Sequence, residues 1–80
     1  MDDYLKGGDT VIKQELRAVM ARYGDRQEDL AGALGMSPPT LSDKINGKVD
    51  FWRAEIEIIA LRYKLTPEDI VRIFFTNLVT

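Results

Sequence analysis

The sequence QEDLAGALGMSPPTLSDKINGK, residues 27–48, decides the fold, because it contains two short helical segments separated by a glycine turn. The first segment covers about residues 27–34 and places its apolar side chains on one helical face. Gly35 follows it and suits the left-handed conformation that ends many helices. Ser37 and Pro38 then start a second helix, because serine caps free backbone N–H groups and proline at the first helical position has none to cap.

The second segment is expected to run from about Pro38 to Asn46 and to end at Gly47. Leu41 and Ile45 lie four residues apart and should point into a core. The small side chain of Ala31 lies where the two helices must approach each other. Two helices joined in this way form a helix–turn–helix unit, whose second helix can enter the major groove of DNA.

The pattern resembles the helix–turn–helix of lambda-like phage repressors and Cro proteins, the XRE group of bacterial regulators. The residues that carry the resemblance are QEDLA at 27–31, LGMS at 34–37, TLS at 40–42 and NGK at 46–48. The resemblance covers about residues 10–75. It implies an all-α, five-helix domain that binds a palindromic double-stranded DNA operator as a symmetric homodimer and represses transcription, as in a phage or prophage regulator.

The resemblance also implies which residues meet DNA. Gln27 would contact a phosphate and brace the following helix, and residues 37–40 would lie nearest the base edges. Asn46 and Lys48 would contact the opposite phosphate backbone. The predicted DNA-binding residues are Gln27, Ser37, Pro38, Pro39, Thr40, Asp43, Lys44, Asn46 and Lys48.

A helical wheel gives a separate prediction for the same helix. With Leu41 and Ile45 turned inward, the side chains of Pro39, Asp43 and Asn46 point most nearly outward. Prolines donate no hydrogen bond but can pack against a thymine methyl group, and an aspartate can accept from cytosine N4 or repel phosphates. Many members of the family carry Arg, Lys or Gln at the outward positions, so the operator sequence is not predicted.

Several of these residues have plainer interpretations. Lys44 and Lys48 could be solvated surface lysines, and Asp43 could pair with a neighbouring cation instead of meeting a base. Phe51 and Trp52 suit a core or a dimer contact better than a base-stacking platform, because such platforms serve single strands.

The rest of the chain is also expected to be helical. Residues 1–9 should be a flexible N-terminal arm, and residues 10–80 the helix–turn–helix DNA-binding domain. Asp25 and Glu28 approximate a capping box for the helix that follows Gly24, and Thr66 with Pro67 marks a helix start. The expected outer helices are Thr10–Tyr23, Trp52–Tyr63 and Pro67–Asn77.

The last two predicted helices carry apolar stripes. Trp52, Ile56, Ile59, Ala60 and Tyr63 form one inward stripe. The final helix has two, one of Ile70, Ile73, Phe74 and Asn77 and one of Val71, Phe75 and Leu78. The second stripe indicates a further buried surface such as a dimer contact, although a small domain could use both stripes for its own core.

Composition excludes several other functions. The 80 residues contain no cysteine and no histidine, so there is no disulfide, no thiol nucleophile and no thiolate or imidazole zinc site. Glu55 and Glu57 lie two apart on different helix faces and should be solvated, so they form no catalytic pair. We expect no enzyme activity, cofactor, metal, small-molecule ligand or further ligand-binding domain. The longest apolar run, 58–61, spans no membrane, and a cytoplasmic location is expected.

The net charge argues against DNA binding when taken alone. The chain has 11 basic and 13 acidic residues, a net charge of −2. The stretch from Asp43 to Arg53 contains three basic and two acidic residues, which is only a weak positive bias. The acidic balance and the Pro38-Pro39 pair therefore leave a second hypothesis open, a protein-interaction module on the same fold, such as an antitoxin or antirepressor-like adaptor.

Overall fold

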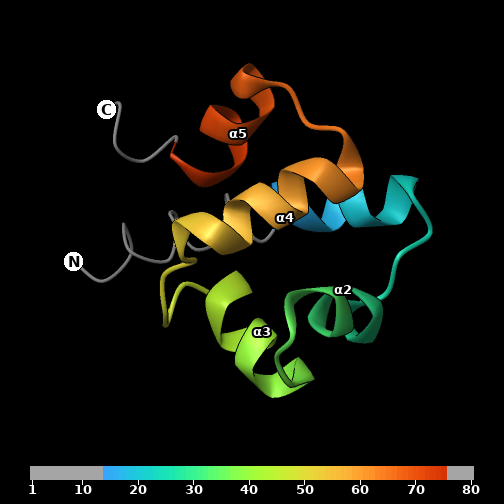
Figure 1. Cartoon of the computed structure of the whole chain (residues 1–80), viewed down its shortest axis with the longest axis vertical. Coiled ribbons are helices and arrows are strands. Elements are labelled where there is room, and N and C mark those ends of the chain that lie inside the picture. Colours follow the sequence, from blue (N-terminus) through green and yellow to red (C-terminus); the bar gives the residue numbers. More distant parts are fainter. Residues whose placement is uncertain (1–13, 76–80) are drawn as a thin grey trace.

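The computed structural model describes residues 14–75, and every regular element in this range is a helix (Figure 1). The first helix occupies residues 14–22 of the described range. It is followed by α2 (Gln27–Leu34), α3 (Pro38–Ile45), α4 (Arg53–Tyr63) and α5 (Pro67–Phe74). The predicted all-α, five-helix architecture is therefore confirmed. The predicted N-terminal arm, the start of the first helix, Asn77 and Leu78 lie outside the described residues.

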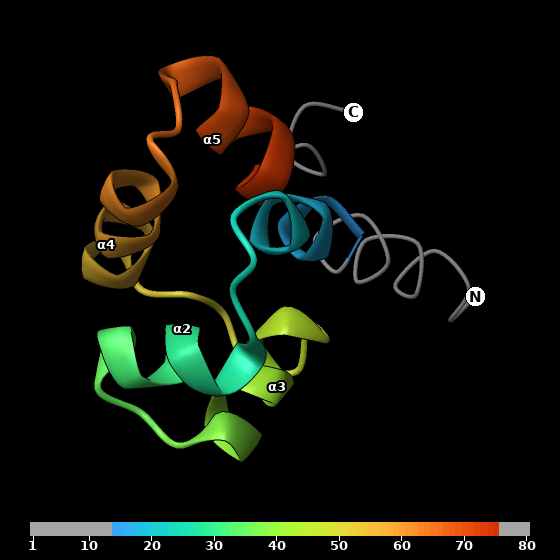
Figure 2. The same cartoon turned by 90° about the vertical axis from the view of Figure 1, so that its right-hand side faces the viewer.

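The helices surround one core to which each of them contributes. Figure 1 and Figure 2 show α2 and α3 together at one end of the molecule, α5 at the opposite end and α4 between them. Full burial of a leucine or isoleucine stabilises the fold by about 1.5–3 kcal/mol. The buried hydrophobic side chains are Leu16, Val19, Met20, Leu30, Ala31, Leu41, Ile45, Ile59, Tyr63 and Ile73.

Two helix starts form as the sequence predicts. The Ser37 hydroxyl accepts a hydrogen bond from the Thr40 backbone N–H at 3.3 Å. At the start of α5, Thr66 Oγ1 accepts from the Asp69 N–H at 3.1 Å, and the Asp69 carboxylate accepts from the Thr66 N–H at 3.0 Å. Gly35 adopts φ 73°, the left-handed conformation that turns the chain from α2 to α3.

The predicted capping box at the start of α2 is wrong. Asp25 does not cap this helix, because its carboxylate accepts two hydrogen bonds from Arg62 on α4. The N-cap residue is Arg26, whose backbone N–H donates to the carboxylate of Asp29 at 2.9 Å. Glu28 instead forms an exposed ion pair with Arg26 at 3.7 Å.

Three predicted boundaries shift by one to three residues. Asn46 is the C-cap of α3 and Trp52 the N-cap of α4, so each of these helices is one residue shorter than expected. Phe74 ends α5, three residues before the predicted Asn77. Trp52 is 69% exposed and does not belong to the core stripe of α4, because its backbone is extended rather than helical.

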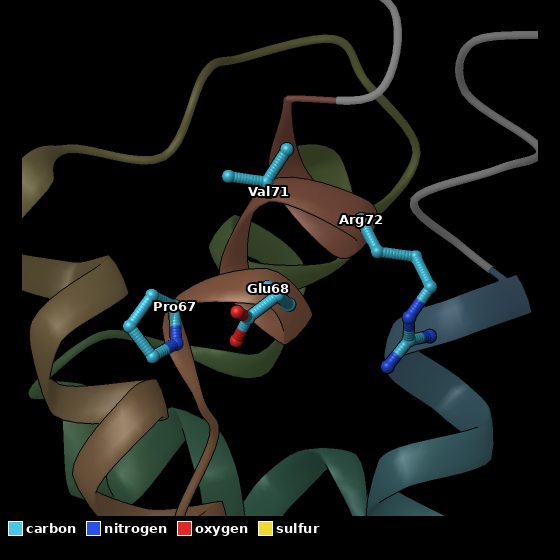
Figure 3. A pocket seen from close by; sticks show the side chains of 4 residues that line it. All are labelled: Pro67, Glu68, Val71 and Arg72. Carbon is cyan, nitrogen blue, oxygen red and sulfur yellow. The ribbon is translucent and has the colours of Figure 1, made fainter.

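Ion pairs tie α5 to the first helix. Arg72 pairs with Asp69 at 2.8 Å and with Glu15 of the first helix. Figure 3 shows the Arg72 side chain reaching toward that helix, at the edge of an open hollow that Pro67, Glu68 and Val71 also line. No helix within residues 14–75 is long and apolar enough to cross a membrane.

Candidate nucleic-acid interface

Backbone hydrogen bonds end α2 at the turn, and a side chain at the start of α2 reaches across to α3. At the turn, the Gly35 N–H donates to the Gly32 carbonyl at 3.2 Å and the Met36 N–H to the Ala31 carbonyl at 3.0 Å. At the other end, Gln27 Nε2 donates to the Pro38 carbonyl at 3.4 Å. Gln27 therefore makes the predicted bracing contact with the following helix.

The outer side of α3 is open to solvent, as the helical wheel predicts. Leu41 and Ile45 are fully buried, whereas Pro39 and Asp43 are exposed. Asn46 is half-buried, and its Nδ2 donates to Ser42 Oγ at 3.4 Å. The exposed members of the predicted set are Ser37, Pro38, Pro39, Thr40, Asp43 and Lys48.

The first three residues of α3 offer no free backbone donor. Pro38 and Pro39 have no N–H group, and the Thr40 N–H is used by the Ser37 hydroxyl. The next N–H, from Leu41, donates to the Ser37 carbonyl at 3.0 Å. A helix start binds phosphate through free N–H groups, so this end of α3 presents proline ring carbons and hydroxyl groups instead.

Lys44 does not belong to this surface, and its predicted contact with DNA is corrected. The residue is only 5% exposed, and its Nζ lies 3.0 Å from Oε1 of Glu55 and 3.1 Å from the Asp50 carbonyl oxygen. The same ammonium group lies 5.5 Å from the centre of the Trp52 ring. Its charge is therefore directed into the protein.

The spacing of α3 contained a signal for this burial. Lys44 lies three residues after Leu41 and next to Ile45, so it shares their helical face. Glu55 was expected to be solvated, but its side chain is only 16% exposed. Glu57 is 63% exposed and matches the prediction.

The surface carries little net charge once Lys44 is removed from it. Lys48 and Arg53 are exposed, and so are Asp43 and Asp50. Within residues 14–75 no cation pairs with the Asp43 side chain, so the alternative in which a neighbouring cation neutralises it finds no support there. The same range contains no group of three or more acidic side chains that could hold a metal ion.

A braced pair of short helices, with the second helix open to solvent on one side, defines a helix–turn–helix DNA-binding domain. The family model of the Cro/C1-type HTH DNA-binding domain matches residues 15–75, which is most of the chain. The chain therefore belongs to the Cro/C1-type helix–turn–helix family, and the resemblance described above is confirmed. No curated protein and no solved structure matches the chain.

Proposed function

We propose that the chain is a sequence-specific transcriptional repressor of the phage type, which acts by occupying an operator on double-stranded DNA. The observation that carries this proposal is the exposed outer side of α3 in a Cro/C1-type domain. An operator that overlaps a promoter would be unavailable to RNA polymerase while the protein occupies it.

Each residue of the surface has a role in this proposal. Gln27, Asn46 and Lys48 contact phosphates and set the register of α3 on the duplex. Pro38 and Pro39 pack against thymine methyl groups, and Asp43 accepts a hydrogen bond from cytosine N4. The hydroxyls of Ser37 and Thr40 lie 2.9 Å apart at the same end of α3 and complete the side that meets the base edges.

The homodimer is proposed to form through a groove at the junction of α4 and α5. This groove has a volume of about 440 Å³ and an apolar lining of Phe51, Ile56, Ile70 and Phe75. Arg53 and Glu57 lie at the same groove and form an ion pair at 3.4 Å. A two-fold axis can place Arg53 of each copy beside Glu57 of the other, so this face is complementary to itself.

The test is a selection from random duplex DNA at physiological salt, followed by sequencing of the retained duplexes. The proposal predicts an inverted repeat whose half-sites lie about one helical turn apart. No enrichment at protein concentrations well above micromolar would contradict it. A stable protein complex without salt-sensitive DNA affinity would instead favour the protein-interaction module.

A further inference from the structure

Lys44 is the buried charged side chain of the described range, and it lies directly behind the surface that faces DNA. Its partner Glu55 uses one oxygen, Oε1, for two contacts. This oxygen lies 3.0 Å from Lys44 Nζ and accepts the Trp52 backbone N–H at 2.9 Å. One carboxylate oxygen therefore joins the last turn of α3 to the first turn of α4.

The same cluster holds the second half of the loop between these helices. The first half of the loop is tied to α3 by backbone hydrogen bonds, since the Gly47 and Lys48 N–H groups donate to the carbonyls of Lys44 and Asp43 at 3.2 and 2.9 Å. Beyond them, the Asp50 carbonyl receives the Lys44 ammonium at 3.1 Å. A side-chain contact from Lys44, rather than a backbone hydrogen bond, thus restrains the part of the loop around Asp50.

Stability alone gives a poor account of a lysine at this position. Removal of an ammonium and a carboxylate from water is unfavourable, and their mutual attraction often only offsets that cost. An apolar pair of similar volume is commonly as stable. What the charged pair adds is a defined geometry, because the ammonium has directional donors and an apolar side chain has none.

We propose that Lys44 and Glu55 are positioning residues for DNA recognition. They fix Asp50 and the start of α4 to the last turn of α3. Lys48, whose own N–H already bonds to the Asp43 carbonyl, is thereby held from both sides, so that phosphate and base contacts form together. Neither residue touches DNA. This inference rests on the proposed function, in which α3 reads base edges and Lys48 contacts the backbone.

The test compares two double variants of the full chain that carry the same chemical changes. Lys44→Met/Glu55→Met removes the buried pair, and Lys64→Met/Glu68→Met removes two exposed charges at the α4–α5 turn. Both variants keep the net charge of −2, so long-range attraction to DNA is the same in each. Affinity is measured for the selected operator and for an unrelated duplex, over a range of salt, at a temperature where circular dichroism shows all proteins folded.

We expect the buried-pair variant to lose about tenfold or more in operator affinity, while its affinity for unrelated duplex stays within about twofold. The exposed-pair variant should match the wild type on both duplexes. Trp52, the single tryptophan, lies against the cluster and should gain mobility in the buried-pair variant, seen as lower fluorescence anisotropy. If that double variant fails to fold, Glu55→Gln keeps the volume and an acceptor oxygen. Measured against Glu68→Gln, which changes the net charge equally at an exposed position, it should show a smaller loss of the same kind.

Three results would overturn the positioning role. Unchanged operator affinity in a folded Lys44→Met/Glu55→Met variant would make the pair purely structural. If the slope of log affinity against log salt fell in Lys44→Met by about 0.9, the value of one phosphate contact, Lys44 would be a direct contact with DNA. Wild-type protein that binds operator and unrelated duplex equally would remove the proposed function itself, and the positioning role with it.

Discussion

Asp25 and Arg62 are joined by two hydrogen bonds, at 2.6 and 2.9 Å, although 37 residues separate them in the chain. The Tyr63 hydroxyl donates to the same carboxylate at 2.5 Å, and the Tyr23 hydroxyl donates to the Tyr63 carbonyl at 2.8 Å. This network fastens the turn after the first helix to the end of α4. None of its residues is among those proposed to contact DNA, so its effect on stability is measured by unfolding, without a binding assay.

Asp25→Ala should lower the free energy of unfolding by about 2 kcal/mol, because it removes the shared acceptor and leaves the partly buried Tyr63 hydroxyl without its partner. Urea denaturation followed by circular dichroism measures the change. Glu68→Ala removes an exposed carboxylate and should change stability by less than about 0.5 kcal/mol. Equal effects of the two substitutions would show that the network contributes nothing beyond a surface charge.

The carboxylate of Asp25 also makes the free energy of unfolding depend on pH. The hydrogen bonds from Arg62 lower the pKa of Asp25, against the opposing effect of burial, with Tyr63 adding to the decrease. The Thr66 backbone N–H, followed by Arg72, lowers the pKa of Asp69 to about 2. A carboxyl group whose pKa is depressed in the folded state stabilises it above the unfolded pKa and loses that contribution as pH falls.

The melting temperature should therefore fall as pH decreases below about 4 and continue to fall toward pH 2. Asp25→Asn should be less stable than the wild type at pH 7, and the difference should shrink as pH approaches 2. Thermal unfolding at a series of pH values measures both trends. A difference that stays constant with pH would show that ionisation of Asp25 does not contribute.

Local signals predicted the parts of the fold that depend on residues three or four apart. Two helix starts were predicted because the capping residue and its partner lie three residues apart in the sequence. These pairs are Ser37 with Thr40 and Thr66 with Asp69. Asp25 was misassigned as a cap for a physical reason. Its residue type suits capping, but distant side chains compete for the same carboxylate, and no local pattern records them.

In the candidate site, too, local spacing predicted some side chains correctly, whereas contacts between helices decided others. The outward direction of Pro39 and Asp43 follows from the 100° step of an α-helix and was predicted correctly. The burial of Lys44 depends on Glu55, which lies on the next helix. A lysine between inward-facing Leu41 and Ile45 indicates a buried partner somewhere, but the sequence alone does not identify it.

Asn46→Ala and Lys48→Met should weaken binding to every duplex, because phosphate contacts carry no sequence information. For Lys48→Met, the slope of log affinity against log salt should fall by about 0.9. Lys64→Met removes an exposed lysine at the far end of α4 and should leave the slope unchanged. A loss confined to the operator would place Lys48 at a base instead of a phosphate.

Phe75→Asp should disrupt the proposed dimer. Phe75 is 37% exposed and lines the α4–α5 groove, so a carboxylate there would be desolvated on association. The variant should bind a palindromic operator no more tightly than a single half-site, whereas the wild type should bind the palindrome more tightly. Analytical ultracentrifugation of the complexes gives the stoichiometry. Leu61→Asp is the control, because Leu61 is 81% exposed and does not line the groove.

Pro39→Ala should change which base is preferred, because it removes the exposed proline ring from the first turn of α3. Pro39 is exposed in the first turn of α3, where no backbone N–H is free, so its ring can contribute only apolar contact. The partner proposed for it is the 5-methyl group of thymine, which uracil lacks. Replacement of operator thymines by uracil, one at a time, should weaken wild-type binding by about fourfold at each contacted position, since one buried methyl group contributes about 0.8 kcal/mol.

The protein variants then show which operator base each side chain contacts. Pro39→Ala should become insensitive to uracil at one thymine and keep the wild-type response at the others. Asp43→Ala should relax the preference for one cytosine, because it removes the acceptor for cytosine N4. Base preferences that stay the same in both variants at every operator position would mean that a different side of α3 faces the groove, and the orientation inferred from Leu41 and Ile45 would then have to be abandoned.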